Sequence, residues 1–468
     1  MAIMKSYKYY STLTLVIASL FVGCKKDWLE AKANKNQSVP TTLSDFQSML
    51  DFSGLVMNVN SFALGEIAAD GHYVTEAAWT SATTSASRNA YTWSLNTPYL
   101  DLDTWRDTYE RVYYSNVVLN GLSNYLIKNE LEIETYNNIK GQALFNRAEA
   151  FHMLSQLYAI PYNKTTSETD LGIPIRLSSD VTEKSTRSSV EQTYNQIIKD
   201  LLEAENLLPL TPIYPTRGSK PALYGLLARV YMTMNDYENC LKYADKSLQL
   251  RSELLDYNSK SQNANFIGGF NTNPANPEIL FHMTMYTSEI SGFLTTNYLV
   301  DQALYNQYHP DDLRRVLFFR NNANGTKSYK GNYFNSTTNM FTGIGTDETY
   351  LMRAECYARM GNTVAAMNDL NSLIKKRWRN TVVFVPFSAI NPEDALSKIL
   401  IERRKELIMR GLRWSDLRRL NVDERFKQTL TRTIGGVNYI LEPGSYKYTF
   451  PIPNDILDYS GMPQTPGW

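Results

Sequence analysis

The spacing of apolar residues divides the chain into helical regions and loop-rich regions. Apolar side chains recur every three to four positions near 104–160, 189–250, 346–377 and 392–420. This period places them on one face of a helix. Pro161 and Pro209 follow two of these runs, and proline favours a helix end at that point. We therefore predict a mainly α-helical protein.

Two of the helical regions share the spacing of tetratricopeptide helix pairs. Residues 224–248 and 350–374 place small, large and aromatic side chains at matching offsets, and Arg-Ala-Glu occurs at both 147–149 and 353–355. Small residues at a helix crossing let the backbones approach closely. Generic amphipathic helices are the alternative, since they also match loose patterns. The two matches in register favour about four tetratricopeptide-like repeats.

Two long segments, 53–103 and 257–345, lack this period and are rich in Ser, Thr, Asn, Gly and aromatic residues. Long loops in a compact domain are usually functional or disordered. We therefore expect these two segments, called here the first and second loop segments, to carry the ligand-binding residues. Residues 40–468 as a whole are predicted to form a single domain.

The N-terminal residues have the pattern of a bacterial lipoprotein signal. Lys5 and Lys8 precede an apolar run, Ser11 to Val22, which is short for a membrane span. Gly23 then precedes Cys24, as in a lipobox. We predict a signal peptide over 1–23, lipid attachment at Cys24 and a polar tether over 24–39. An uncleaved signal anchor with an incidental cysteine is the alternative.

The composition narrows the function classes. The chain has 468 residues, with 47 Lys plus Arg and 47 Asp plus Glu, so it lacks the basic excess of a general nucleic-acid binder. Four His and three Cys argue against a multi-metal enzyme or a disulfide scaffold. We expect Cys240 and Cys356 to be buried thiols inside helices. The 32 Tyr suit a surface that contacts polar ligands.

No motif for catalysis or for a cofactor is present. A nucleophile elbow, a P-loop, a dinucleotide fingerprint and a zinc-protease motif are all missing from the sequence. Glu402 and Glu406 share a helix face, and glycosidases use paired carboxylates, but the basic residues around these two favour structural ion pairs. Arg413, Asp416, Arg418 and Arg419 are predicted to form a buried or half-buried network around Trp414. We predict no enzyme activity and no cofactor; calcium binding stays open, although no loop has EF-hand spacing.

Aromatic residues in the loop segments are the candidates for ligand contact. Sugar rings present flat C–H faces that an aromatic ring can cover, while polar side chains bond to the hydroxyls. The candidates in the first segment are Asp70, Tyr73, Trp79, Trp93 and Asn96, and those in the second are Tyr298, Tyr329, Tyr333 and Phe334. Core packing is the alternative for each aromatic residue. Trp79 is favoured because its neighbours are Ala, Thr and Ser without apolar periodicity.

Several blocks of the sequence together resemble the SusD/RagB family of Bacteroidetes outer-membrane lipoproteins. The blocks are Cys24 to Leu29, the series Trp105, Tyr109 and Asn116, Gly172 to Ile175, 220–246, Asn276 to Phe281, Glu402 to Leu407, Arg413 to Arg419, Phe450 to Pro453 and Gln464 to Trp468. Met409-Arg410-Gly411 and Leu412 depart from the family pattern, which has an acidic residue before the glycine and often a histidine after it.

The resemblance implies a cell-surface lipoprotein with four helix-pair repeats. Such a protein would bind a nutrient, typically an oligosaccharide, and deliver it to a SusC-like TonB-dependent barrel transporter in the outer membrane. It would reach the membrane through its lipid anchor and bind no nucleic acid. Three other hypotheses stay open: a binder of peptides or another nutrient on the same scaffold, a surface hydrolase, and a purely structural repeat adaptor.

Overall fold

A computed structural model of the chain describes residues 40–60, 62–82, 84–95, 102–269, 271–272, 275–285, 299–334, 336 and 339–468. The chain divides into two compact units at Thr42, and every element below belongs to the unit Thr42–Trp468. Cys24, the predicted signal peptide and the predicted tether lie outside the described residues.

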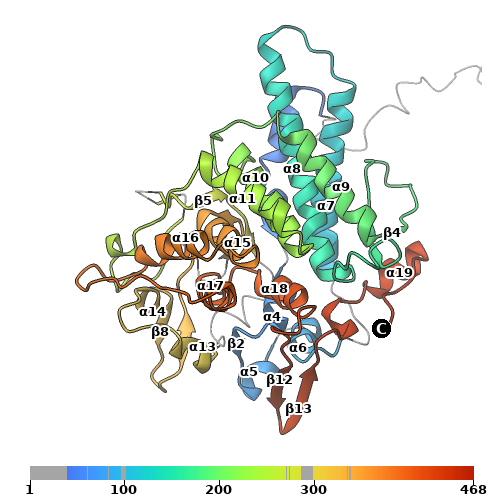
Figure 1. Cartoon of the computed structure of the whole chain (residues 1–468). Coiled ribbons are helices and arrows are strands. Elements are labelled where there is room, and N and C mark those ends of the chain that lie inside the picture. The colour runs from blue at the N-terminus through green and yellow to red at the C-terminus, as the bar shows by residue number, and fades with distance from the viewer. Residues whose placement is uncertain are drawn as a thin grey trace, which may run out of the picture. The chain divides into compact units, whose positions relative to one another are not determined.

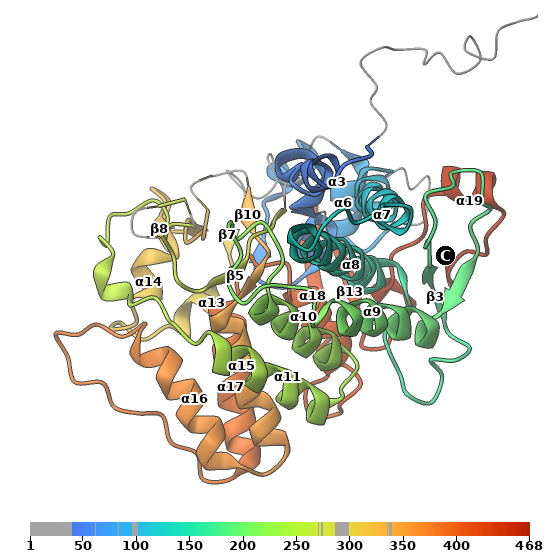
Figure 2. The same ribbon diagram turned by 90° about the horizontal axis from the view of Figure 1, so that it is seen from above.

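Helices packed in pairs form the frame of this unit (Figure 1). The pairs are α7 (Leu102–Ser123) with α8 (Leu131–Tyr158), α10 (Lys220–Thr233) with α11 (Tyr237–Leu250), and α15 (Thr346–Arg359) with α16 (Thr363–Lys375). They are joined by α9 (Val190–Ala204), α17 (Pro392–Glu406) and α18 (Arg413–Leu420). Helix α8 packs on both α7 and α9, and α15 packs on α11, α16 and α17. Figure 2 shows this succession from above. The predicted mainly α-helical fold is confirmed.

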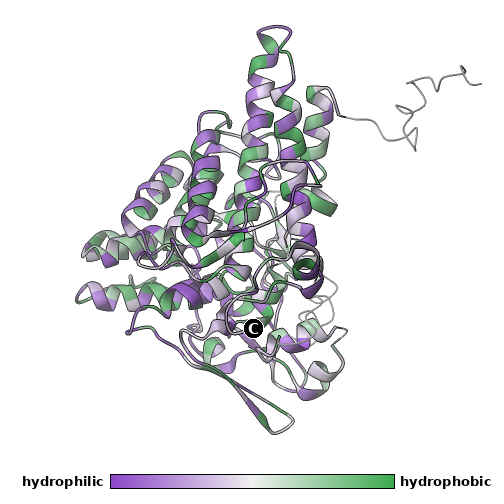
Figure 3. Ribbon diagram, turned by 90° about the vertical axis from the view of Figure 1, so that its right-hand side faces the viewer, coloured by the Kyte–Doolittle hydropathy of each residue, from purple (hydrophilic) through white to green (hydrophobic). Residues whose placement is uncertain are grey.

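Local sequence signals explain where these helices begin. Ser189 and Gln192 form a reciprocal capping box at the start of α9. Ser219 caps α10 and Asn391 caps α17, each followed by a proline in the first turn. Apolar and polar residues alternate around the helices, as Figure 3 shows. Within the described part of the chain, no helix combines the length and the apolar character that crossing a membrane requires.

The last helical region, predicted near 392–420, consists of two helices. Helix α17 ends at Glu406, and α18 follows as a separate helix. Met409 and Gly411 between them have φ values of 62° and 71°, in the left-handed region. Such a backbone breaks a right-handed helix and turns the chain. The turn lets Trp414 enter the core, where its ring centroid lies 5.3 Å from that of Phe450.

The remaining elements are short. The first loop segment and its approach contain α3 (Leu43–Leu50), the π-helical turn η1 (Ser53–Met57), β1 (Val59–Asn60), α4 (Ala63–Ala68), β2 (His72–Tyr73), α5 (Glu76–Thr80) and α6 (Ser85–Tyr91). The second contains η2 (Tyr257–Ser259), β5 (Ile279–Phe281), β6 (Thr284–Met285), β7 (Leu299–Val300), α13 (Gln302–Asn306), α14 (Arg314–Leu317), β8 (Phe319–Asn321), β9 (Lys327–Tyr329), β10 (Met340–Phe341) and β11 (Ile344–Gly345). Elsewhere are β3 (Leu171–Pro174), β4 (Arg187–Ser189), β12 (Leu430–Ile434), β13 (Val437–Leu441), η3 (Tyr446–Tyr448) and α19 (Asn454–Ser460).

Strand pairing joins the two loop segments to each other. Strand β1 runs parallel to β6 with Val59 opposite Thr284, and β6 pairs antiparallel with β10. Strand β2 pairs antiparallel with β7, and His72 lies opposite Val300. Two stretches more than two hundred residues apart in sequence are therefore joined by two separate small sheets, β1-β6-β10 and β2-β7.

The core is apolar but contains buried polar groups. Cys240 and Cys356 are buried free thiols, as predicted. Burial raises the pKa of Cys356 well above its ordinary value, so the thiol stays protonated. Around Trp414, Asp416 accepts hydrogen bonds from Arg403 at 2.8 Å and from Arg419 at 2.8 Å. The predicted network is therefore present in part: Asp416 and Arg419 are joined, with Arg403 as an additional member. Arg413 instead pairs with Asp70, and Arg418 donates to backbone carbonyls at the end of α8.

Glu66 on α4 is a buried carboxyl whose protonation should affect stability. Burial raises its pKa to about 7, partly opposed by a hydrogen bond from the backbone N–H of Gly411. From pH 4.5 to 7 the carboxyl of Glu66 loses its proton in the unfolded chain but keeps it in the folded chain. The contribution of Glu66 to the free energy of unfolding therefore falls as the pH rises.

Glu66→Gln keeps an oxygen that can accept from Gly411 and removes the titration. We expect the stability of the variant relative to the parent to increase by up to about 3 kcal/mol between pH 4.5 and 8. Urea unfolding of both proteins at these two pH values measures the difference. An equal stability difference at both pH values would contradict the assignment of this proton to Glu66.

Candidate ligand-binding site

The two loop segments meet at a seam formed by short strands. Tyr73 on β2 pairs with Leu299 on β7, and β7 in turn lies beside β9, which ends at Tyr329. A hydrogen bond also connects the two segments at this seam: the side-chain amide of Asn58 donates to the carbonyl of His282 at 2.8 Å. Residues that the sequence placed in separate candidate regions are thus neighbours in space.

Tyr73 and Trp79 of the first segment keep part of their surface in solvent. Tyr73 is 38% exposed. Trp79 on α5 is half-buried, and its indole Nε1 donates to the carbonyl of Arg88 at 3.0 Å. This hydrogen bond fixes the orientation of the ring. Glu76 on the same short helix lies near Gly435 in the β12–β13 turn, which places α5 beside that hairpin.

Asp70 has a structural ion pair. Its carboxylate accepts from Arg413 at 2.6 and 2.9 Å, and Arg404 lies 3.1 Å away. Burial alone would raise the pKa of Asp70, but these two arginines hold it well below its ordinary value. The carboxylate therefore connects the first loop segment to the turn between α17 and α18, and its oxygens are already engaged.

Trp93 and Tyr333 are buried, which contradicts their predicted contact with a ligand. Trp93 is 1% exposed, donates from Nε1 to the carbonyl of Ala68 at 3.0 Å and packs under the guanidinium of Arg432. Tyr333 is also buried, and its hydroxyl donates to Glu278 at 2.5 Å. Core packing was the alternative interpretation of both residues in the sequence, and the structure supports it.

Phe334 is half-buried at the edge of the second segment. Its ring centroid lies 5.0 Å from that of His282. Burial lowers the pKa of His282 to about 4, so this ring is neutral at pH 7. The predicted contacts Asn96 and Tyr298 lie outside the described residues.

A pocket of about 280 Å³ opens in the second segment; we call it the second-segment pocket. It is lined by Asn265, Phe266, Arg320, Tyr329, Lys330, Asn332, Ser336 and Met340. Of these, only Tyr329 was among the aromatic candidates. Phe266 was missed because nothing in its neighbourhood of Asn and Gly distinguishes a pocket residue from an ordinary loop residue.

Hydrogen bonds fix both walls of this pocket. Lys330 Nζ donates to the carbonyl of Ala264 at 2.9 Å, and partial burial lowers the pKa of this ammonium. The Asn332 side-chain oxygen accepts from the N–H groups of Phe334 and Phe341, while its amide donates to Ser336. One side chain thus links Phe334, Ser336 and Phe341. A pocket with fixed walls needs little ordering when a ligand binds.

The chemistry of the second-segment pocket suits binding. Phe266 and Tyr329 offer aromatic faces, while Arg320 and Asn265 carry hydrogen-bond donors on exposed side chains. The lining residues include no carboxylate, whereas glycoside hydrolysis ordinarily uses a pair. Among the described residues, no cluster of three or more His, Cys, Asp or Glu side chains is arranged to hold a metal ion.

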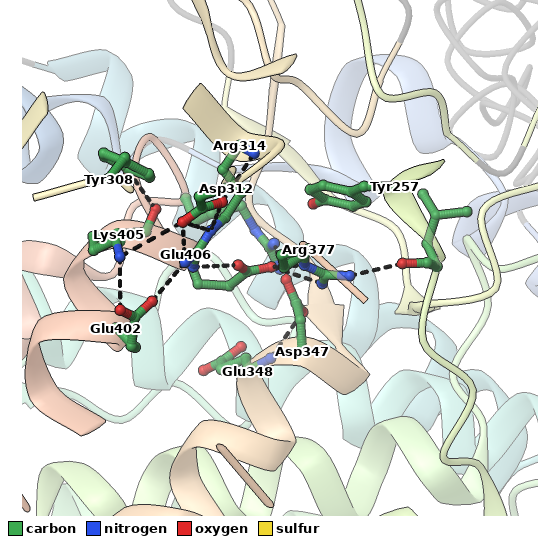
Figure 4. A network of polar contacts seen from close by, with 12 residues as sticks. Tyr257, Tyr308, Asp312, Arg314, Asp347, Glu348, Arg377, Glu402, Lys405 and Glu406 are labelled. Carbon is green, nitrogen blue, oxygen red and sulfur yellow. Dashed lines mark hydrogen bonds and ion pairs between the residues drawn. The ribbon is translucent and has the colours of Figure 1, made fainter. Parts of the chain in front are cut away.

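A buried ionic network lies behind the second segment, and Figure 4 shows it from close by. Arg314 on α14 donates to Glu402 at 2.6 Å and to Glu406 at 2.9 Å, both on α17. Arg377 donates to Glu406 and, at 2.7 Å, to Glu278. The interpretation of Glu402 and Glu406 as ion-pair residues is confirmed.

Most basic partners of Glu402 and Glu406 come from distant parts of the chain rather than from α17 itself. On α17, only Lys405 pairs with Glu402, at 2.6 Å, whereas Arg403 pairs with Asp416 and Arg404 with Asp70. Burial raises the pKa of Glu278 to about 7 against the opposing effect of Arg377. Arg314 holds the pKa of Asp312 below its ordinary value despite burial. The network anchors the second loop segment to α17.

A larger pocket, of about 430 Å³, lies outside both loop segments. It is lined by residues of α7, of the stretch from Pro174 to Ser185 and of α19. The sequence interpretation did not identify it, because the helix α7 and the C-terminal residues were assigned only structural roles.

Comparisons with known proteins give a consistent result. A family model described as "Starch-binding associating with outer membrane" matches residues 27–232, and a second, described as "SusD family", matches residues 319–468. No curated protein sequence matches the chain.

Solved structures match over most of the chain. A SusD superfamily protein from Bacteroides vulgatus has 22% identity and a TM-score of 0.75, covering 92% of this chain and 100% of its own. One from Bacteroides thetaiotaomicron has 23% identity and a TM-score of 0.71, covering 91% and 100%. A SusD-like carbohydrate binding protein from Bacteroides vulgatus has 20% identity and a TM-score of 0.67, covering 90% and 97%. At these identities the structures establish the fold.

Proposed function

The chain belongs to the SusD/RagB family, and from this premise we propose that it is a non-catalytic binding protein for an oligosaccharide at the outer membrane. The observation that carries the proposal is the second-segment pocket. It combines two aromatic faces with amide, guanidinium and ammonium donors, and none of its lining residues among those the structure describes carries a carboxylate. Aromatic faces cover the C–H side of a sugar ring while donors bond to its oxygens.

The proposal includes the route by which the protein reaches the membrane and passes on its ligand. Lipid on Cys24 would hold it at the outer membrane, exposed at the cell surface, because two or more acyl chains anchor a protein stably. The bound oligosaccharide would then pass to a SusC-like TonB-dependent barrel transporter. The lipobox pattern and the family description "associating with outer membrane" support this arrangement.

A glycan-panel binding screen tests the ligand class. The chain from Lys25 onward retains every described residue and is the protein to use. We expect saturable binding of at least one oligosaccharide and no formation of new reducing ends. Sustained turnover by the pure protein would overturn the non-catalytic assignment. Binding of peptides in place of glycans would favour the alternative of another nutrient on the same scaffold.

Aromatic variants locate the site. Phe266→Ala should weaken binding about tenfold, equivalent to about 1.4 kcal/mol, because a stacking face is lost. Tyr329→Phe keeps the ring and should bind like the parent. Trp79→Ala tests the aromatic residue that the sequence favoured, on α5 in the first segment. Binding that is lost in Trp79→Ala and kept in Phe266→Ala would move the site to α5.

A further inference from the structure

The larger pocket brings together three parts of the chain that are far apart in sequence. Helix α7 forms one wall, the stretch after β3 forms the second, and α19 forms the third. Figures 1 and 2 show α19 and the β3–β4 region on the same side of the unit as α7. The volume of about 430 Å³ lies in the range of about 300–1,000 Å³ that is usual for small-molecule sites.

Aromatic side chains of both α7 and α19 line this pocket. Trp105 and Tyr109 on α7 form an interior pair, with ring centroids 4.8 Å apart. One turn further along, Tyr113 is 41% exposed, and Tyr459 on α19 is 91% exposed. Two solvent-exposed tyrosines at the rim of one cavity leave a large apolar surface in water that a ligand would cover.

The second wall is a loop that is cross-linked to itself and to α7 by hydrogen bonds. The side-chain amide of Asn116 donates to the carbonyls of Arg176 and Ser178, at 2.9 and 3.2 Å. The Arg176 guanidinium donates to the carbonyls of Asp180 and Glu183 from inside the loop. The loop is therefore held in shape before any ligand arrives, which lowers the cost of ordering it on binding.

The same loop presents hydroxyl groups at the pocket. Ser178, Thr182 and Ser185 are among its lining residues, and Lys184 adds an exposed ammonium. Ser185 Oγ accepts a hydrogen bond from Arg176 at 3.1 Å. A hydroxyl that accepts one bond still has a proton to donate, so it can bond to a neutral hydroxylated ligand. Ser178 Oγ likewise accepts from the backbone N–H of Asp180, whereas Thr182 Oγ1 already donates to the Asp180 carboxylate. Ser178 and Ser185 are therefore the hydroxyls that keep a proton to donate.

We propose that this pocket is a second carbohydrate-binding site, which takes a short neutral oligosaccharide between Tyr113 and Tyr459. The sugar faces pack on the two tyrosine rings, and the ring hydroxyls bond to the loop from Ser178 to Ser185. None of its lining residues belongs to the second-segment pocket. The inference therefore concerns a separate site and needs its own variants.

Calorimetric titration with maltotriose, xylotriose and chitotriose tests the proposal on the chain from Lys25 onward. The variants are Tyr113→Ala, Tyr459→Ala and the double variant. Tyr214→Ala is the control, since Tyr214 is 57% exposed and does not line this pocket. We expect each single change to weaken binding at this site about tenfold, because one stacking face is lost, and the double change to abolish it.

The two sites are distinguished by which variant removes which binding event. Loss of one event in the Tyr113/Tyr459 double variant, with the event sensitive to Phe266→Ala retained, supports a second site. Unchanged binding of all three trisaccharides in the double variant overturns it and leaves the proposed function intact. Trileucine serves as a peptide probe. If trileucine binds the parent but not the double variant, and no trisaccharide shows this pattern, the pocket is a peptide site and the carbohydrate assignment is overturned. No binding of any probe at this pocket would also overturn it.

Discussion

Arg314→Ala should destabilise the protein by about 3–5 kcal/mol, the cost observed when one partner of a buried ionic network is removed. Arg314 has no exposed side-chain surface, and it contacts Asp312, Glu402 and Glu406. Its removal leaves three acidic groups close together and out of water. Lys405 lies 2.6 Å from Glu402 and 3.6 Å from Asp312, and Arg377 still pairs with Glu406 at 2.7 Å. Arg377 also pairs with Glu278, so two cations remain for four buried carboxyl groups.

Urea unfolding followed by circular dichroism measures this effect. Arg425→Ala is the matched control, because Arg425 also pairs with two acidic residues, Glu393 and Asp423, but its side chain is 47% exposed. Solvent screens such pairs, so we expect a loss of less than about 1 kcal/mol. Arg314→Lys keeps one charge and should fall between parent and alanine variant. Equal stability of Arg314→Ala and Arg425→Ala would show that the network contributes nothing beyond surface pairing.

The helical frame could be predicted because its signals are local. The apolar period, the cap at Ser189 and the prolines after two helical runs all act within a few residues of the helix they specify. The buried thiols followed from the same reasoning, since Cys240 occupies a small-residue crossing position. The end of α17 was not predictable in this way, because Met409 adopts a left-handed backbone that its residue type does not favour.

The candidate site depended on contacts that no local pattern records. Strand β2 of two residues finds β7 more than two hundred positions away. Trp93 and Trp79 have similar polar neighbours in sequence, yet only Trp93 is covered by Arg432 from the distant β12 strand. Burial of a loop aromatic is therefore decided by tertiary contacts. The same holds for the buried ionic network. The sequence identified Glu402 and Glu406 on α17 as ion-pair residues, but it did not identify Arg314 and Arg377 as their partners.

Gly343→Ala should be the second strongly destabilising change, with a loss of roughly 3 kcal/mol, at the upper end of the cost of overpacking. Gly343 lies between β10 and β11, where a Cβ would stand 1.9 Å from the carbonyl oxygen of Phe281 and 2.9 Å from the backbone nitrogen of Met283. Both are backbone atoms of the β5–β6 region, and they cannot rotate away as a side chain can. The main chain must shift, and with it the hydrogen bond from Arg229 to the Gly343 carbonyl.

The position of Gly343 also predicts where the damage appears. The strands on either side of it, β10 and β11, pair with β6 and β5, and β6 is the strand that joins the second loop segment to β1 of the first. Displacing this backbone should therefore disturb the seam and weaken oligosaccharide binding at the second-segment pocket under conditions in which the helices remain folded. Gly54→Ala is the control, since a Cβ there meets no atom within 4 Å. Thermal unfolding and glycan titration of the two variants compare them directly, and a Gly343→Ala protein with parental stability would show that the strand layer yields to the added methyl group.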